Sequence, residues 1–441
     1  MKRILRPARK ALHLSTRVIS KAQNISAKVE QKVSNIIDQD GSLNANSKVK
    51  AINDIVYSFH RGLYNCEPIS PALPKLRGDS VNLFVPTIDS SAMFGGIATA
   101  IRVAEKIATK TNRSLRFVCV DRPGNIAHAQ TFLKSIGSPL ELKSSDMIDV
   151  SGRKGVHYGY IDLRPDDVNI ATAWWTAQQL SRMQLKQPFI YIIQDFEPIF
   201  YNYSDLYVFA KQTYEQGNYI ALFNTNLVRQ YLKSKGFEHA VRNAVVFEPA
   251  VDRSLFYPRD QKNEKKKIFI YGRPNVARNL YIHALNIVDQ AFTEKILISS
   301  EWDVFIAGDE KAPSILLNSG VIAKNVGKLK MNQYAEIAGT TDLAISLMMA
   351  PHPSYPPLEL ASSGSTVVTS AYDIKTDLSM YSDNIFVAQL NSFDMMAKIK
   401  EAISLTREER LKNVQNNKLT SNWDDALSGP IDELIAKLKL S

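Results

Sequence analysis

Two segments of this 441-residue chain show the same order of a short apolar strand, a glycine-containing loop and an amphipathic helix. The first runs from the strand 81–86 through Gly95 and Gly96 into a helical pattern at 97–109. The second runs from the strand 267–271 through a loop at 272–279 into a helix that ends near residue 292. Neighbouring parallel strands need a helical crossover, so this order predicts a parallel sheet in each half. We therefore expect two Rossmann-like α/β domains.

The length predicts two or three domains, and the bulk composition is that of a soluble globular protein. Hydrophobic residues make up 45% and charged residues 22%, which is ordinary for a globular protein. No run approaches the roughly 18–20 apolar residues that cross a bilayer, and the N-terminus lacks the apolar core of a signal peptide. The two cysteines, Cys66 and Cys119, fit a reducing cytoplasm. We expect them to be buried apolar residues rather than nucleophiles.

Positive charge is concentrated at the N-terminus. Residues 1–35 hold nine Lys and Arg and one acid, Glu30, which gives +8 of the net +10. Apolar residues are interleaved with these cations at helical spacing. Such a helix can lie on an anionic membrane face, but a solvated arm without a partner fits the pattern equally well. The absence of aromatic residues from residues 1–35 argues against nucleic acid as the partner of this arm.

Polar side chains follow the apolar strand 188–193 directly. Gln194, Asp195 and Glu197 stand at its carboxyl end, where ligands bind in parallel sheets. Asp195 is a candidate for orienting an acceptor hydroxyl or taking its proton, and the alternative is that an acid here caps the following turn. Trp174, in the preceding helix, is interpreted either as core or as a surface for stacking a sugar. These four residues form the predicted acceptor site.

The loop 272–279 places two cations before a helix. Arg273 and Arg278 stand five residues apart there, together with Gly272. Backbone N–H groups, the helix dipole and two guanidinium groups would together hold a diphosphate. The alternative is that both arginines are surface charges.

A third candidate site lies in the stretch 346–369. An apolar strand leads into a Pro-rich turn, and a helix is predicted to start near Pro357 with Glu359 in its first turn. Gly364 ends that helix before a β-branched strand at 366–369. The predicted arrangement is an open loop and a helix N-terminus beyond the carboxyl end of a strand, which is where ligands bind in such folds.

This stretch resembles the donor-site motif of GT-B glycosyltransferases of family four, which runs Glu, seven residues, Glu. The segment 356–361 (PPLELA) and Gly364 match the second half of the motif, whereas the first Glu falls on Pro351, beside His352. The segment 351–359 (PHPSYPPLE) is similar to WsaF-type rhamnosyltransferases, which use dTDP-rhamnose.

The resemblance implies a GT-B fold, in which two Rossmann-like domains face each other across a cleft. The domains expected are a basic helical extension and linker at 1–50, an acceptor-side domain at 51–258, a donor domain at 259–420 and a C-terminal helix that crosses back at 421–441. We expect an exposed, charged hinge at 259–267, and the last helix at 431–438.

Carried over residue by residue, the resemblance implies that Glu359 holds the ribose and that Gly272, Arg273 and Arg278 hold the diphosphate, with Arg278 replacing the lysine of the family. Asp195, Arg273 and Arg278 are the predicted catalytic residues. The predicted donor-binding residues are Gly95, Gly96, Gly272, Arg273, Arg278, Gly327, Lys328, Leu329, His352, Tyr355, Leu358 and Glu359.

The function so implied is transfer of L-rhamnose, or a related deoxyhexose, from a dTDP-sugar to a lipid-linked or polymeric cell-surface glycan such as O-antigen, rhamnan or capsule, with retention of configuration. No cofactor and no metal are expected, because no D-x-D stands where a metal would hold the diphosphate. A UDP- or GDP-hexose donor and a non-catalytic sugar-binding or scaffold subunit remain as alternatives. The expected location is the cytoplasm, including peripheral attachment to the inner face of the plasma membrane through residues 1–35.

Overall fold

The computed structural model describes residues 69–72, 79–89, 95–151, 159–183, 185–260, 264–309 and 312–440. The predicted basic helix at 1–35, the linker at 36–50 and Cys66 lie outside these residues. All described residues belong to one compact unit. Within this part of the chain, no helix is both long and apolar enough to cross a membrane.

The N-terminal half forms a seven-stranded sheet in the order β4-β3-β2-β6-β7-β8-β9, and every neighbouring pair is parallel. Its strands are β2 (Ser80–Val85), β3 (Ser114–Cys119), β4 (Met147–Asp149), β6 (Val168–Ala171), β7 (Phe189–Ile193), β8 (Tyr219–Asn224) and β9 (Val245–Phe247). Two short strands, β1 (Ile69–Ala72) and β5 (Gly159–Asp162), pair separately in parallel. The order turns at β2 and β6, which is the topological switch point of this sheet.

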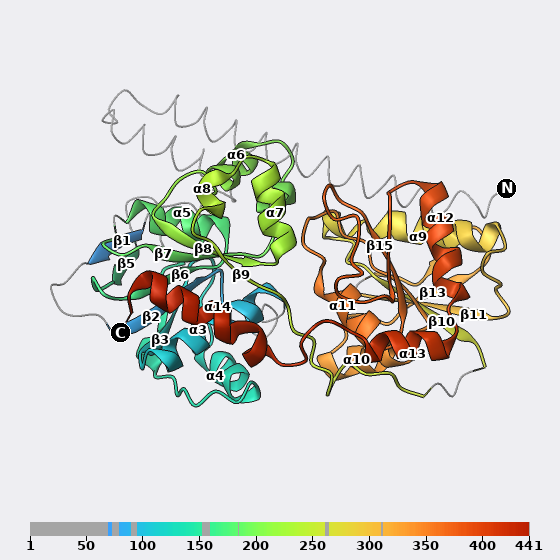
Figure 1. Ribbon diagram of the computed structural model, residues 1–441, viewed down its shortest axis with the longest axis horizontal. Helices are drawn as coiled ribbons and strands as arrows, with labels where there is room; N and C mark the ends of the chain where they lie inside the picture. The colour runs from blue at the N-terminus through green and yellow to red at the C-terminus, as the bar shows by residue number, and fades with distance from the viewer. Residues whose placement is uncertain are drawn as a thin grey trace, which may run out of the picture. The chain divides into compact units, whose positions relative to one another are not determined.

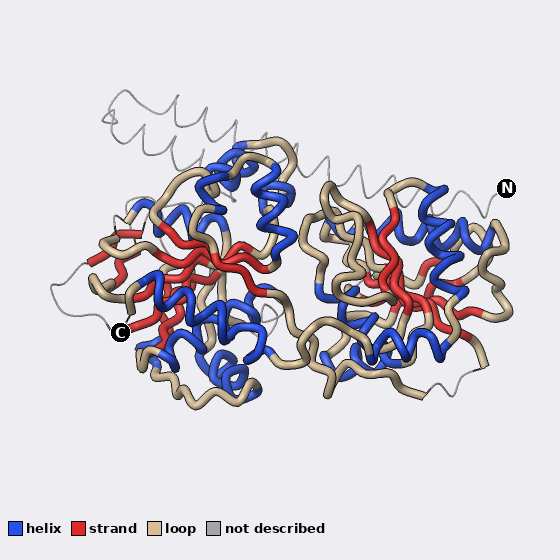
Figure 2. The backbone as a smooth tube through the Cα atoms, in the orientation of Figure 1, coloured by secondary structure: helices blue, strands red, loops and turns tan. Residues whose placement is uncertain are grey.

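The sheet is buried on both faces, as its apolar strands predict. In β7, Ile190 and Ile192 face one core while Phe189, Tyr191 and Ile193 face the other. Helices α3 (Gly96–Lys110) and α4 (Ile126–Ser135) cover the first face. Helices α5 (Trp174–Arg182), α7 (Asn226–Ser234) and α8 (Glu238–Val241) cover the second, and α6 (Asp205–Gln212) packs beside α5. Figure 2 shows the strands between these helical layers.

The C-terminal half repeats this design in the order β12-β13-β11-β10-β14-β15-β16. Its strands are β10 (Lys266–Tyr271), β11 (Trp302–Ala307), β12 (Ile315–Leu316), β13 (Ile322–Asn325), β14 (Leu343–Ile345), β15 (Thr366–Ser370) and β16 (Ile385–Ala388). All pairs are parallel except β12 with β13. Helices α9 (Tyr281–Thr293) and α12 (Ser392–Ser404) cover one face, and α10 (Met331–Gly339) and α11 (Tyr355–Ser362) the other. The predicted pair of α/β sheets is confirmed.

The last helix differs from the prediction. It is α14 (Trp423–Leu438), which begins eight residues before the expected start at 431 and contains Pro430. Leu427, Ile431 and Leu434 are buried in the core that α3 also lines, so the red C-terminal helix lies against α3 in Figure 1. Burial of this face and two ion pairs to α3 outweigh the hydrogen bond that a proline inside a helix removes.

The expected hinge at 259–267 also needs correction. The Arg259 guanidinium donates to the Ala335 and Leu255 carbonyl oxygens, and the Arg259 N–H donates to Gly339 O. Residue 259 is therefore fixed to α10, and β10 already begins at Lys266. Val251 and Phe256 already pack in the core of the C-terminal half, so the chain first crosses between the halves just after β9.

Candidate active site

The candidate site begins at the switch point of the C-terminal sheet. Strands β10 and β14 are neighbours there, and their carboxyl ends lead into the loop 272–280 and the loop 346–354. The Met349 N–H donates to the Arg278 carbonyl at 2.9 Å, which joins the two loops. The sequence-predicted diphosphate loop and the Pro-rich loop are thus brought together.

Gly272 is required by close packing within the protein. A Cβ at this position would stand 2.9 Å from the Tyr281 ring. Gly308, in the loop after β11, packs against Gly272. Its φ of +138° favours glycine, and a Cβ at this position would lie 2.5 Å from Gly272 O. These glycines therefore let the loops after β10 and β11 approach each other. Arg273 follows, and its Nε lies 3.4 Å from Asn279 Oδ1.

Arg278 lies in a 3-10 turn (Ala277–Asn279) just before α9. Its guanidinium carbon stands 3.9 Å from the centre of the Phe200 ring, which belongs to the N-terminal half. Burial lowers the pKa of Arg278, and the charge of Asp195 opposes that effect. Among the described residues Arg278 has no ion pair within 4 Å, and its buried Nε has no hydrogen-bond partner. This group is available to a ligand.

His352 supplies a second buried donor beside Arg278. Its Nδ1 accepts the Ser354 N–H at 2.9 Å, so in the neutral ring the proton is on Nε2. Burial and the charges of Lys375 and Arg278 lower the pKa of His352 to about 3, which keeps the ring neutral. Within the described part of the chain, Nε2 has no hydrogen-bond partner.

Lys375 holds the loop of His352 in place. The lysine is fully buried, and its Nζ donates to Met348 O at 3.0 Å and to His352 O at 3.5 Å. Burial lowers the pKa of Lys375 to about 7, and Asp195 opposes the shift. Burial in turn raises the pKa of Asp195 to about 6, while Arg278 and Lys375 hold it down. The charges of Arg278 and Lys375 therefore act on Asp195 across the two halves, while its Oδ1 accepts the Phe196 N–H at 2.9 Å.

Glu197 and Trp174 have structural contacts. Glu197 Oε2 accepts the Trp174 N–H at 2.8 Å and so caps the N-terminus of α5. Burial raises the pKa of Glu197 to about 8. The Trp174 ring is 1% exposed, with Trp175 and Tyr201 edge-on beside it. No face of this ring is open to a sugar, so the prediction of Trp174 as an acceptor residue is wrong and its interpretation as core holds.

The two glycines before α3 differ in what they require. Gly96 packs on Gln194: a Cβ there would lie 3.0 Å from Gln194 Nε2, which donates to Gly96 O at 2.9 Å. Gly95 has a φ of +54°, and none of the described residues lies within 4 Å of the place where a Cβ would stand. Close approach of a ligand is therefore possible at Gly95, whereas Gly96 serves a contact between two loops.

The three predicted donor residues of helix α11, which are Tyr355, Leu358 and Glu359, lie in different surroundings. Tyr355 Oη lies 2.8 Å from Asn224 Nδ2 and 3.0 Å from Thr99 Oγ1, both of the N-terminal half. Leu358 is fully buried in the core, so its side chain faces no ligand. Burial raises the pKa of Glu359 to about 7, and the Tyr334 hydroxyl counteracts this.

The predicted base-site residues lie in the loop before α10. Gly327 has a φ of +76°, and its N–H donates to Asn325 Oδ1 at 3.0 Å. Lys328 is exposed, and Leu329 packs at the edge of the core that contains Leu358. The Gly308 N–H donates to Gly327 O, so this loop lies beside Gly308, which packs against Gly272 of the predicted diphosphate loop.

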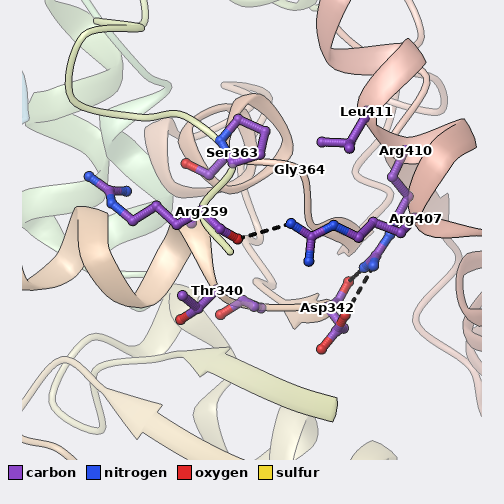
Figure 3. Close-up of a pocket in the computed structure, with 11 residues that line it drawn as sticks. Arg259, Thr340, Asp342, Ser363, Gly364, Arg407, Arg410 and Leu411 are labelled. Carbon is purple, nitrogen blue, oxygen red and sulfur yellow. Dashed lines mark hydrogen bonds and ion pairs between the residues drawn. The ribbon is translucent and has the colours of Figure 1, made fainter. Parts of the chain in front are cut away.

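A separate small pocket lies at the opposite, amino-terminal end of the same sheet (Figure 3). Arg259, Arg407 and Arg410 line it, and each guanidinium group already makes hydrogen bonds, although the buried Nε of Arg410 makes none among the described residues. Arg407 donates to Arg259 O and to Asp260, and Arg410 forms an ion pair with Asp342 at 3.0 Å. The pocket is therefore a structural junction rather than a second anion site.

Residue patterns did not reveal three members of the candidate site: Phe200, Tyr334 and Lys375. Each is distant in sequence from the site residue that it contacts or influences: Phe200 from Arg278, Tyr334 from Glu359 and Lys375 from His352. None stands in a motif or at a periodic position. No sequence signal marks Lys375, because it stands between Asp373 and Asp377 in a polar stretch where an exposed lysine is the ordinary expectation.

Comparison with known proteins agrees with this arrangement. The WsaF N-terminal domain matches residues 80–226, and the WsaF C-terminal domain matches residues 266–400. The O-antigen biosynthesis protein RfbC of Myxococcus xanthus is 28% identical over 338 residues, which are 75% of this chain and 25% of that protein. The chain thus spans about a quarter of the length of this curated relative.

Solved structures with the same fold are distant in sequence. A sucrose-phosphate synthase from Thermosynechococcus elongatus has a TM-score of 0.55 at 11% identity, over 82% of this chain and 99% of that one. A glycosyltransferase from Rickettsia africae has a TM-score of 0.53 at 13% identity, over 82% and 98%. HepE of Anabaena, in complex with UDP and glucose, has a TM-score of 0.51 at 13% identity, over 81% and 98%.

The two switch-point sheets and the loops at their carboxyl ends define a GT-B glycosyltransferase fold. Both halves of the chain match the two domains of one family. This protein belongs to the WsaF family of GT-B glycosyltransferases.

Proposed function

We propose that this protein transfers a deoxyhexose, most specifically L-rhamnose, from a dTDP-sugar to a growing cell-surface glycan. The observation that supports a nucleotide-sugar site most directly is the pair of buried donors without partners, Arg278 Nε and His352 Nε2, on two joined loops. Buried polar groups are normally hydrogen-bonded, so such a pair indicates a ligand rich in oxygen acceptors.

In the proposed mechanism Arg273 and Arg278 bind the diphosphate before α9 and neutralise the charge that develops on it as the glycosidic bond breaks. The neutral His352 ring donates through Nε2 to an oxygen of the donor, and the Glu359 carboxylate accepts from the ribose hydroxyls. Asp195, whose pKa the charges of Arg278 and Lys375 lower, orients the acceptor hydroxyl in this mechanism. No metal is included, because two guanidinium groups supply the positive charge.

The sugar, the base and the acceptor rest on family membership. WsaF-type enzymes suggest dTDP-L-rhamnose, and the name of the Myxococcus relative suggests O-antigen as the glycan. HepE was solved with UDP and glucose, so a UDP-hexose is the main alternative donor. We place the reaction in the cytoplasm, with residues 1–35 available to bring the protein to the inner face of the plasma membrane.

The test is calorimetric titration of the purified full-length protein with dTDP, UDP and GDP without added metal. We expect dTDP to bind most tightly and Arg278→Ala to weaken its binding about tenfold to a hundredfold, since a charge-assisted hydrogen bond contributes about 1.5–3 kcal/mol. Arg407→Ala, which removes an exposed arginine of the pocket in Figure 3, is the matched control and should bind normally.

Tighter binding of UDP or GDP than of dTDP would leave the assignment as a glycosyltransferase intact and reject dTDP-rhamnose as the donor. Absence of binding by all three nucleotides would reject the proposed site and favour a non-catalytic subunit.

A further inference from the structure

The contact between Arg278 and Phe200 joins the two halves of the protein at the candidate site. Phe200 ends the 3-10 turn Glu197–Phe200, which follows β7, and Arg278 lies in the turn before α9. The guanidinium carbon is 3.9 Å from the ring centre, within the range of a cation–π interaction. The Phe200 side chain remains 37% exposed, so the ring is not simply part of a core.

The turn that carries Phe200 is fixed at both ends. At its start, Glu197 Oε2 accepts the Trp174 N–H at 2.8 Å, and the Glu197 N–H donates to the Tyr214 hydroxyl at 3.1 Å. Just after its end, the Tyr201 hydroxyl accepts from Trp174 Nε1 at 2.8 Å. Trp174 is itself buried. The position of the Phe200 ring is therefore set by a hydrogen-bonded frame, which also accounts for the buried carboxyl of Glu197.

Arg278, by contrast, has few restraints of its own. Its main-chain carbonyl is held by the Met349 N–H, but its side chain makes no hydrogen bond or ion pair within the described residues. An arginine side chain without such contacts loses about 2 kcal/mol of rotamer entropy when a ligand fixes it. A ring that stacks on the guanidinium limits this motion while leaving the N–H groups at its edge available.

We infer that Phe200 is a positioning residue that holds the Arg278 guanidinium ready for the diphosphate of the donor. This inference rests on the proposed function, because it assigns a partner to the same site. Phe200 and Arg278 come from different halves of the chain. The affinity of Arg278 for the diphosphate therefore depends on the contact between the two halves. The Trp174, Glu197 and Tyr201 contacts then support the site indirectly, without touching the donor.

The experiment compares the affinities for a nucleoside diphosphate and a nucleoside monophosphate, because only the diphosphate can make all the contacts that we assign to Arg278. For the base that wild type prefers, both are titrated against Phe200→Leu and Phe200→Tyr. We expect Phe200→Leu to weaken diphosphate binding about threefold to thirtyfold, the range of a cation–π contact. Monophosphate binding should change less than twofold, and Phe200→Tyr, which keeps the ring face, should restore wild-type affinity.

Tyr257→Leu is the matched control, since Tyr257 stacks on Arg259 at 4.1 Å away from the site and should leave both affinities unchanged. If Phe200→Leu binds both nucleotides like wild type, or weakens both equally, the inference is wrong while the proposed function stands. Failure of Phe200→Tyr to restore affinity also overturns it. If wild type binds no nucleoside diphosphate, it is the proposed function that fails.

Discussion

Burial shifts the pKa values of the ionisable side chains around the Arg278 loop toward their neutral forms. The pKa rises for Asp195 and Glu359 and falls for His352 and Lys375. Groups with such shifts gather at functional sites because a bound ligand completes their charge balance. For Glu359 the consequence is direct, since only the carboxylate accepts from two ribose hydroxyls.

We predict that Glu359 makes nucleotide binding pH-dependent near neutrality. With a pKa raised to about 7, the side chain is mostly ionised at pH 8 and mostly protonated at pH 6. Affinity for dTDP should therefore fall as the pH falls, and Glu359→Gln should bind worse than wild type by a factor that shrinks about tenfold from pH 8 to pH 6. Titration calorimetry at each pH measures the ratio, in which the phosphate protonation of dTDP cancels.

The exposed Glu336, on α10, provides the control, because Glu336→Gln should show no pH-dependent ratio. A ratio for Glu359→Gln that stays constant across this pH range would remove Glu359 from the ribose site.

The sequence motifs led to Arg278, His352 and Glu359 because they stand at fixed offsets from strand ends and prolines. Their neighbours could not be found this way. Phe200 lies 78 residues before Arg278 in the chain, and Lys375 follows His352 by 23, so only the folded sheets bring them together. The error for Trp174 has the same origin, because the sequence does not show which ring faces are covered.

At the scale of elements, α14 shows how tertiary packing overrides local preference. Pro430 cannot donate a backbone hydrogen bond, and the last helix expected from the sequence begins only after it, at residue 431. The buried residues Leu427, Ile431, Leu434 and Leu438 nevertheless continue one helical face through the proline. Lys106 and Lys110 of α3 form ion pairs with Asp424 and Asp432 at 2.5 Å. The apolar strands, in contrast, were predictable because both faces of each sheet are buried and leave few alternatives.

We predict that Leu434→Ala destabilises the N-terminal half by about 2–5 kcal/mol, the usual cost of removing a fully buried leucine side chain. The measurement is thermal unfolding followed by near-ultraviolet circular dichroism. Glu433→Ala, at the neighbouring exposed position, should change stability by less than about 0.5 kcal/mol. Equal melting temperatures for Leu434→Ala and wild type would show that α14 contributes no core to this half.

At the scale of the whole molecule, polar contacts join the two halves of the described chain beside apolar ones such as Ile374 against the N-terminal core. The Tyr381 hydroxyl donates to Glu248 Oε2 at 2.7 Å, and Lys235 of α7 pairs with Asp373 at 2.6 Å. The side chains of the latter pair are 41% and 33% exposed, so water and salt weaken it. Such contacts suit halves that separate to admit a donor and then close again.

We predict that Asp373→Ala weakens dTDP binding by no more than about fivefold, since exposed ion pairs contribute up to about 1 kcal/mol. The effect should become smaller in 1 M salt, where the screening length falls to about 3 Å. Calorimetry at low and high salt measures it. Lys398→Ala breaks an exposed pair within α12 and should have no effect at either salt concentration. An effect of Asp373→Ala that is undiminished in 1 M salt would contradict the role of this ion pair in closure.

The chain passes between the halves twice, and the two passages are bonded to each other. The Val251 N–H donates to Thr420 O at 3.0 Å, and the Arg253 guanidinium donates to Asn417 O and Leu419 O. A single connecting segment would let one half rotate freely about that segment. Two segments bonded side by side resist twisting and still allow bending, so we expect any movement of one half against the other to follow one bending direction that returns Phe200 to Arg278.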